Sequence, residues 1–210
     1  MDSMLDDELR KRVEKATVRF PKRGGQGVVV PGSLVLTAAH CIEWDLDGEM
    51  TLNENIFLEK INCDGRQIFA GIVVVEPVLD IAVLGEPYGH TFYEESNDYI
   101  DTLELIEPIE IRTKDLERYQ AIHAFIFTHK RTWLEVAVQR SGNDGAPALV
   151  ITGAPIEPGT SGSPVIDEEG RLIGVVSSCG TADPFFHGKI PRPNIALPVW
   201  VVDRILKKQS

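Results

Sequence analysis

The chain has 210 residues, of which 43% are hydrophobic and 25% are charged, as in a soluble globular protein with a substantial core. Its formal net charge of −11 disfavours nucleic acids and anionic lipid surfaces as partners, because like charges repel. The charged N-terminus lacks the apolar core of a signal peptide, and no later stretch reaches the ~18 apolar residues that span a bilayer. We therefore expect a cytoplasmic protein with no nucleic-acid or membrane partner.

The first predicted element is a helix over residues 4–16, because Leu5, Leu9, Val13 and Ala16 fall on one face at helical spacing. Such a helix most simply packs as a cap on the domain, and the alternative is a docking element. We take residues 1–16 as this helix and residues 17–210 as one domain.

From residue 17 onward, short β-rich runs alternate with Gly, Pro, Asn and Asp, which predicts an all-β barrel or sandwich. The first set of predicted strands is Gly27–Val30, Leu34–Ala38, Ile56–Glu59, Ile68–Val75 and Ile81–Leu84. The second set is Gln120–Thr128, Trp133–Gln139, Ala148–Thr152, Pro164–Ile166, Arg171–Ser178 and Asn194–Pro198. The segment Asp167–Gly170 is typical of a hairpin turn between two of them.

The two strand sets predict two β units of similar size, at about 17–90 and 119–199. The connector, about 91–118, is strongly acidic over 94–110, and this composition favours a solvated loop or linker. The amphipathic tail with terminal lysines predicts a C-terminal helix over 200–208.

Three segments carry residues of catalytic type, each at the edge of a predicted strand. They are Leu36–Cys41, which contains His40, Leu79–Leu84, which contains Asp80, and Gly159–Pro164, which contains Ser161. A serine hydroxyl needs an adjacent base to become a nucleophile, histidine can take and return the proton, and a buried carboxylate fixes the imidazole tautomer. Glycines beside the serine let backbone N–H groups point inward toward a developing oxyanion.

Each segment taken alone has a simpler interpretation. His40 fits a hydrogen-bonded histidine at a strand end, and Asp80 fits a turn or cap. The Gly159–Pro164 loop fits an ordinary turn or a phosphate-binding nest, although no helical pattern follows it. The order His, Asp, Ser at strand edges favours the catalytic interpretation of all three.

These three blocks resemble the signatures of trypsin-like serine peptidases, and the resemblance covers most of residues 17–207. It implies two six-stranded antiparallel β-barrels with short N- and C-terminal helices. It also implies that Ser161 is the nucleophile, His40 the general base and acid, and Asp80 the orienting acid. The N–H groups of Gly159 and Ser161 would form the oxyanion hole.

The resemblance continues beyond the serine. Segment 174–179 is similar to the strand that pairs with the substrate backbone. It implies that Ser177 lies beside the catalytic acid and that Ser178 and Cys179 line the peptide groove. Asn194 would stand at the far wall of the S1 pocket, and Pro155 at its base. With no acid at that base, we expect a shallow apolar pocket for Ala, Val or Leu, although Asp183 could still reach a basic side chain.

Thr160 departs from secreted trypsins, in which an aspartate at this position pairs with a newly cut N-terminus. Cys41 also has no upstream cysteine partner. The chain has three widely spaced cysteines, Cys41, Cys63 and Cys179, which fit a reducing compartment. One disulfide among them is the alternative. These departures place the sequence nearer the HtrA-type branch, although no PDZ domain follows. Activation by an N-terminal salt bridge is therefore not expected.

We expect no metal, because the segment Asp45–Glu49 only partly matches a calcium loop. We expect no cofactor, because acyl transfer through a serine needs none. The predicted function is a serine endopeptidase acting on protein or peptide substrates. A protease in the cytoplasm suggests control by an activating partner or by oligomerisation, with a distorted oxyanion loop in the idle state. The alternatives are a catalytically idle interaction module and an esterase, but an α/β-hydrolase would require another residue order.

Overall fold

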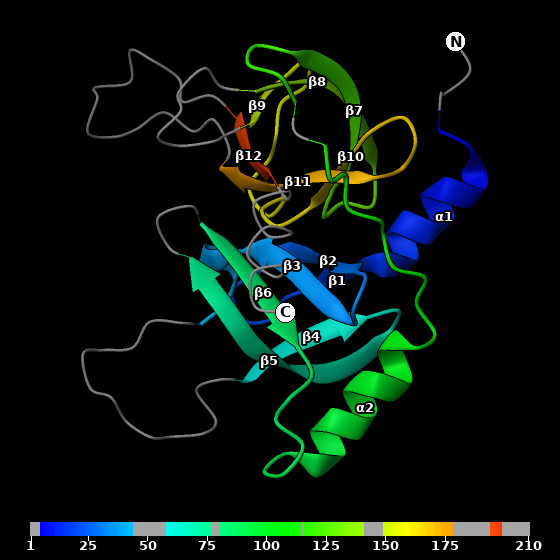
Figure 1. Cartoon of the computed structure of the whole chain (residues 1–210), viewed down its shortest axis with the longest axis vertical. Coiled ribbons are helices and arrows are strands. Elements are labelled where there is room, and N and C mark those ends of the chain that lie inside the picture. The colour runs from blue at the N-terminus through cyan, green and yellow to red at the C-terminus, as the bar shows by residue number, and fades with distance from the viewer. Residues whose placement is uncertain are drawn as a thin grey trace.

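The computed structural model describes residues 5–43, 58–76, 80–114, 116–140, 149–178 and 194–198. The chain forms two closed six-stranded antiparallel barrels, one above the other in Figure 1. The predicted all-β fold with two such barrels is confirmed. The predicted C-terminal helix over 200–208 lies outside the described residues.

In each barrel the two strands at the ends of the strand order pair with each other and close the sheet. These pairs are β1 with β4 and β7 with β10. Barrel 1 consists of β1 (Thr17–Arg19), β2 (Gln26–Val30), β3 (Leu34–Ala38), β4 (Leu58–Cys63), β5 (Arg66–Glu76) and β6 (Ile81–Gly85). Barrel 2 consists of β7 (Ala121–Phe127), β8 (Trp133–Arg140), β9 (Leu149–Thr152), β10 (Pro164–Ile166), β11 (Leu172–Ser178) and β12 (Asn194–Pro198). The three-residue β1 was not among the predicted strands.

Side-chain alternation explains which face of each strand is buried. In β4 every second residue is buried, whereas all five residues of β2 and of β6 are buried because these strands are covered on both sides. Asp64 and Gly65 both have positive φ, 47° and 80°, between β4 and β5. This is the geometry of the tight two-residue turn that matches the twist of a hairpin.

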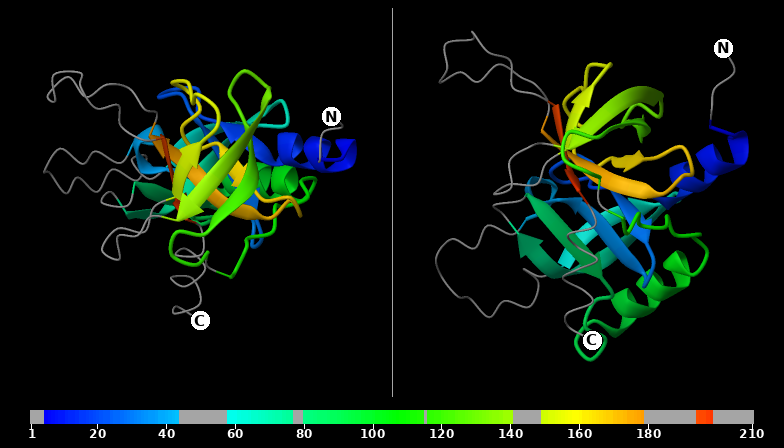
Figure 2. Two further views of the ribbon diagram at one scale, coloured as in Figure 1. Left: turned by 90° about the horizontal axis from the view of Figure 1, so that it is seen from above. Right: turned by 45° about the horizontal axis from the view of Figure 1, so that its top comes forward.

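Helix α1 (Asp7–Ala16) is capped at its N-terminus by Asp6, whose carboxylate accepts the N–H of Leu9 at 2.7 Å. Its buried side, with Val13 and Ala16, faces barrel 1, while Leu9 packs on the β10–β11 turn of barrel 2 at Gly170. The helix therefore contacts both barrels, and Figures 1 and 2 show it at the side of the molecule.

The acidic connector contains helix α2 (Tyr93–Leu103), so the prediction of a solvated loop over 94–110 was wrong for its first part. The helix buries Ser96, Tyr99, Thr102 and Leu103, and its carboxylates occupy the other side. Tyr99 is fully buried, and its hydroxyl donates to the carbonyl oxygen of Ser33 at 2.7 Å. An amphipathic spacing inside an acidic stretch was therefore misread as solvation alone.

The rest of the connector runs along the junction of the barrels. The N–H of Ile109 donates to Val29 of barrel 1 at 2.9 Å, and that of Leu172 in barrel 2 donates to Glu110 at 2.8 Å. The predicted turn Asp167–Gly170 joins β10 to β11, and its buried Asp167 is paired with Arg112 and Arg171. These bonds fix how the two barrels sit against each other.

Candidate active site

His40 lies where β3 leaves barrel 1. The strand ends at Ala38 and the chain makes one 3-10 turn, Ala39–Cys41, that the N–H of Ile42 closes on Ala39. Ala39 and Cys41 are buried, whereas the His40 side chain between them is 49% exposed. The sequence of small residues thus packs the turn inward and leaves one imidazole toward solvent.

Asp80 stands at the same end of the neighbouring strand. Ala38 pairs with Ile81 in the antiparallel β3–β6 register, so His40, two residues past Ala38, faces Asp80, one residue before Ile81. The N–H of Ala39 donates to the carbonyl oxygen of Asp80 at 3.0 Å. Asp80 has a φ of 52°, a left-handed conformation that aspartate tolerates better than most residues.

The Asp80 carboxylate is hydrogen-bonded to both the ring and the backbone of His40. His40 Nδ1 lies 3.0 Å from Oδ1 and 2.9 Å from Oδ2, and the His40 backbone N–H donates to Oδ1 at 3.0 Å. Because an ionised carboxylate only accepts hydrogen bonds, Nδ1 carries a proton and Nε2 is the basic nitrogen of the neutral ring.

Barrel 2 completes the environment of this carboxylate. Ser177, on β11, donates its hydroxyl to Asp80 Oδ2 at 2.5 Å. Burial alone would raise the pKa of Asp80, but the hydrogen bonds from His40 and Ser177 outweigh it and lower that pKa. The hydrogen bond with Asp80, with a smaller effect of the neighbouring Cys41 thiol, raises the pKa of His40 well above 6.5. The proton between His40 and Asp80 therefore resides on the His40 ring, and Asp80 is the ionised partner.

Ser161 lies in a loop of barrel 2 that is held by β2 of barrel 1. The N–H of Gln26 donates to the Ser161 carbonyl oxygen at 2.7 Å, and the N–H of Gly162 donates to Val176 at 2.6 Å. A Cβ on Gly25 would stand 3.0 Å from the Ser161 carbonyl oxygen and 2.5 Å from Cys41 Sγ. The serine loop is therefore placed next to the residue that follows His40. Among the described residues, no hydrogen bond joins the His40 ring to the Ser161 hydroxyl, which is common before substrate binds.

Gly162 allows this close approach. Its φ is +77°, and a Cβ there would lie 1.7 Å from the Gln26 carbonyl oxygen and 2.6 Å from Thr37 Oγ1. Thr37 itself donates to the Gln26 carbonyl oxygen at 2.6 Å, and it lies on β3, three residues before His40. Gln26 therefore links the strand that carries His40 with the loop that carries Ser161.

The turn before Ser161 provides the candidate oxyanion donors. The N–H of Thr160 donates to Glu157 at 3.2 Å, with Pro158 and Gly159 at the two central positions and Gly159 at φ +90°. This is a type II turn, which requires glycine at its third residue. Within the described part of the chain, neither Gly159 nor Ser161 donates its N–H to a protein acceptor. Both groups are therefore available for a developing oxyanion.

The remaining predicted substrate residues are placed less fully. Pro155 is exposed in the segment between β9 and the serine loop, next to the buried Ile156. Ser178 pairs through its backbone with Ile195, and Asn194 pairs with Ile151. Cys179 and Asp183 lie outside the described residues, as does the partial calcium motif Asp45–Glu49.

Sequence reasoning missed two residues that the structure places at this site. Gln26 is fully buried, and its Oε1 accepts a hydrogen bond from Ser163 at 2.6 Å. His129 lies 3.2 Å from the hydroxyl of Thr160 through its Nδ1. A polar Gln at the start of an otherwise apolar strand was the one sequence signal for Gln26. His129 had no such sequence signal.

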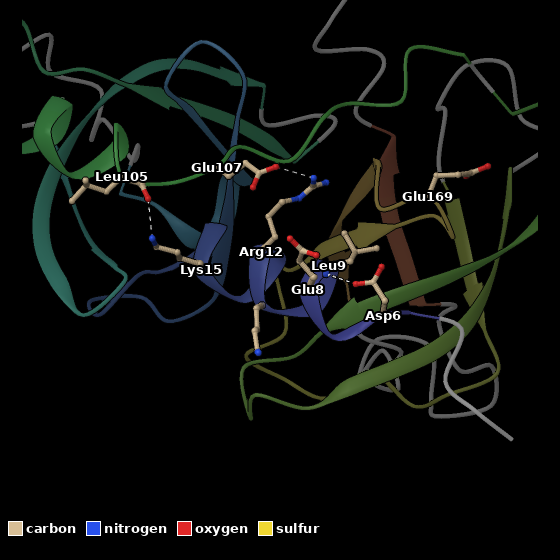
Figure 3. Close-up of a pocket in the computed structure, with 9 residues that line it drawn as sticks. Asp6, Glu8, Leu9, Arg12, Lys15, Leu105, Glu107 and Glu169 are labelled. Atoms are coloured by element: carbon tan, nitrogen blue, oxygen red, sulfur yellow. Dashed lines mark hydrogen bonds and ion pairs between the residues drawn. The ribbon is translucent and has the colours of Figure 1, made fainter.

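A hollow of about 620 Å³ lies beside α1, away from these residues. Figure 3 shows two of the interactions along it, Arg12 with Glu107 at 3.0 Å and Lys15 with the Leu105 carbonyl oxygen at 2.9 Å. In the described ranges, no group of three or more His, Cys, Asp or Glu residues is arranged to hold a metal ion. No described helix has the length and apolar content of a membrane span.

Comparisons with known proteins identify a family and a shared fold. The trypsin-like peptidase domain family matches residues 25–175, whereas no curated protein matches the chain. Among solved structures, the inactive form of Rv3671c from M. tuberculosis, carrying a serine-to-alanine mutation, is 16% identical, with a TM-score of 0.59 over 99% of this chain and 93% of that one. The active form of the same protease is also 16% identical, with a TM-score of 0.56 over 97% of this chain and 86% of that one.

A serine endoprotease from Yersinia pestis is 18% identical, with a TM-score of 0.59 over 99% of this chain and 66% of that one. At such identities the likeness shows a shared fold, and the family match covers both strands of barrel 1 that lead to His40 and Asp80 as well as the Ser161 loop. The chain therefore belongs to the trypsin-like peptidase domain family.

Proposed function

We propose that this protein is a serine endopeptidase that hydrolyses peptide bonds of protein substrates through an acyl-enzyme on Ser161. The observation that carries the proposal is the carboxylate of Asp80, which binds the His40 ring, the His40 backbone and Ser177 at once. Orientation of a half-exposed imidazole beside a serine loop favours a catalytic role for Asp80 over a purely structural one.

The chemistry follows from these contacts. Asp80 holds the Nδ1–H tautomer, so Nε2 of the neutral ring takes the proton of Ser161 Oγ as this oxygen attacks the substrate carbonyl carbon. The N–H groups of Gly159 and Ser161 bind the oxyanion, and His40 then gives the proton to the leaving amine. Water repeats the sequence on the acyl-enzyme and releases the acid. No step needs a cofactor.

The substrate preference belongs to the same proposal. Because Pro155 and its neighbours Ala154 and Ile156 carry no charge, the S1 pocket takes small or medium apolar side chains such as Ala, Val or Leu. Asn194 on β12, together with Ser178 and Cys179, would line the remaining groove.

Control of the enzyme by a protein partner or by oligomerisation, in the cytoplasm, is a further part of the proposal. The hydrogen-bonded type II turn at Gly159 leaves the N–H groups of Gly159 and Ser161 without protein acceptors among the described residues. It therefore does not support a distorted oxyanion loop as the idle state. Control would then act on access to the site or on the His40–Ser161 contact. Full cleavage of unfolded substrates by the purified protein alone would contradict control by a partner.

A fluorophosphonate probe tests the nucleophile directly, because it phosphonylates only an activated serine. We expect labelling of the native protein, none of Ser161→Ala and none of heat-unfolded protein, followed by cleavage after small apolar residues in a peptide-library digest. Absence of labelling, with and without candidate partners, would instead support an idle interaction module. Labelling with ester but no peptide hydrolysis would support an esterase.

A further inference from the structure

The turn between β7 and β8 lies against the oxyanion turn. His129 Nδ1 is 3.2 Å from Thr160 Oγ1, and the ring atoms Cγ and Cδ2 lie 3.4 Å from the point where a Cβ on Gly159 would stand. The next residue, Lys130, pairs with the Glu157 carboxylate at 2.5 Å. Consecutive residues of one turn therefore contact three positions of the other.

The β7–β8 turn is itself fixed. The N–H of Arg131 donates to Thr128 and that of Thr128 to Thr132, both at 2.9 Å, and the two threonine hydroxyls are 2.8 Å apart. Arg131 has a φ of 60°, as in a three-residue hairpin loop that ends in a left-handed residue. From barrel 1, Arg19 Nη2 donates to the His129 carbonyl oxygen at 3.0 Å. His129 is thus held on a support independent of the oxyanion turn.

Thr160 is 0% exposed, so its hydroxyl needs a partner within the protein. His129 is the partner that the described residues provide. A threonine at this position carries no charge for an N-terminal ammonium to bind, so the turn has to be ordered in another way. Without an ordered turn, the peptide before Gly159 could rotate and turn the Gly159 N–H away from the oxyanion.

We propose that His129 is a positioning residue for the oxyanion hole, acting through the hydroxyl of Thr160 and through ring contact with Gly159. The inference rests on the proposed peptidase function of Ser161. Because His129 would act through Thr160 and Gly159, its loss should weaken binding of the transition state more than binding of the substrate. Losing one oxyanion donor costs roughly 10²–10³ in rate, and misplacement of about 1 Å costs up to ~10².

The test compares His129→Ala, His129→Asn and Thr160→Val with the wild type. Asn can place an amide near the position of Nδ1, whereas Ala and Val remove one partner of the bond. His123→Asn is the matched control, because His123 lies on β7, just before the turn that carries His129, but binds Glu135 and Glu168. We expect kcat to fall about 10- to 100-fold in His129→Ala and Thr160→Val, with KM changed less than about threefold. His129→Asn should recover most of kcat.

Hydrogen exchange measured by mass spectrometry gives a readout that does not depend on activity. The N–H groups of Thr160 and Ser163 are bonded within the loop, to Glu157 and Thr160. We expect the peptide covering residues 157–163 to exchange at least tenfold faster in His129→Ala and Thr160→Val than in His123→Asn. Unchanged exchange, or unchanged kcat in an active wild type, overturns the inference. A wild type that fluorophosphonate does not label refutes the peptidase proposal, while the exchange result still decides the role of His129.

Discussion

Ser163 donates its hydroxyl to Oε1 of Gln26 at 2.6 Å, although the two residues stand in different barrels and 137 positions apart. The same Gln26 binds the Ser161 carbonyl oxygen through its N–H and accepts the Thr37 hydroxyl at its own carbonyl oxygen. Its side-chain Nε2 has no partner among the described residues. Alignment of the serine loop with the histidine strand therefore depends on one buried glutamine.

This pairing predicts a non-additive mutant cycle. Ser163→Ala leaves Oε1 of Gln26 unpaired in a fully buried position, and we expect it to lower the free energy of unfolding by about 1–3 kcal/mol. Adding Gln26→Met removes the orphaned acceptor, so the double variant should be more stable than Ser163→Ala alone. Urea unfolding of the four proteins measures the cycle. Additive effects would show that the bond contributes nothing of its own.

Gly162→Ala should prevent the active site from forming. A Cβ would lie 1.7 Å from the Gln26 carbonyl oxygen, a distance that only separation of the barrels can relieve. Gly32→Ala is the control, because its φ of +86° causes the same backbone strain while its Cβ would meet only Leu34 at 3.9 Å. We expect Gly32→Ala to cost about 1–2 kcal/mol and to keep fluorophosphonate labelling. Equal labelling of the two variants would contradict the close contact.

The pH dependence of the reaction follows from His40. Only the neutral ring accepts the serine proton, and the hydrogen bond with Asp80 raises its pKa above 6.5, so the labelling rate should rise with pH through a midpoint above 6.5. In Asp80→Asn the midpoint should move down toward 6.5, and the rate should fall by about 10⁴. NMR titration of the His40 ring checks the direction independently. A midpoint below 6.5 in the wild type would contradict the assignment.

Glu59 predicts a pH-dependent stability. It is 3% exposed, accepts the Glu43 N–H at 3.0 Å, and burial raises its pKa above 4.5. The folded state thus favours the protonated acid, and its stability falls as pH rises from 4.5 through the folded pKa. Glu59→Gln keeps an acceptor without the charge, and we expect Tm to rise by roughly 1–3 °C at pH 7. Below pH 4 the two proteins should melt alike, and a variant that is less stable at pH 7 would refute this account.

Tyr119 adopts a φ of 63°, and the residue is 62% exposed. A bulky residue in this left-handed region is strained by about 1–2 kcal/mol, a cost that glycine avoids. We expect Tyr119→Gly to raise the free energy of unfolding by up to about 1 kcal/mol. Tyr88→Gly is the control, since Tyr88 is equally exposed without a positive φ, and it should give no gain. A loss of stability in Tyr119→Gly would show that its ring packing matters more than its strain.

The strands and the positions of His40, Asp80 and Ser161 at strand ends and in a loop could be predicted because their signals are local. Alternation along β4, the turn at Asp167 and the short blocks around His40, Asp80 and Ser161 each lie within a few residues. The antiparallel register of β3 and β6 then brings His40 and Asp80 together with no further information.

The other site residues depend on contacts that no short segment contains. Gln26 meets Ser163, and His129 meets Thr160, only after the barrels close and dock, so neither pairing has a periodic signal. Helix α2 was missed for a different reason. Its carboxylates suggested solvation, although Ser96, Tyr99 and Leu103 already had the spacing of a buried helical face.

The contact of Gly162 with the Gln26 carbonyl oxygen has a consequence for biosynthesis. The residues of barrel 1, including His40 and Asp80, which pair at the ends of β3 and β6, are synthesised before Ser161 and β11. Because the serine loop takes its position only against finished β2 and β3, a nascent chain has no assembled nucleophile. On the proposed function, the order of translation would keep a half-made protein from cutting itself or its neighbours.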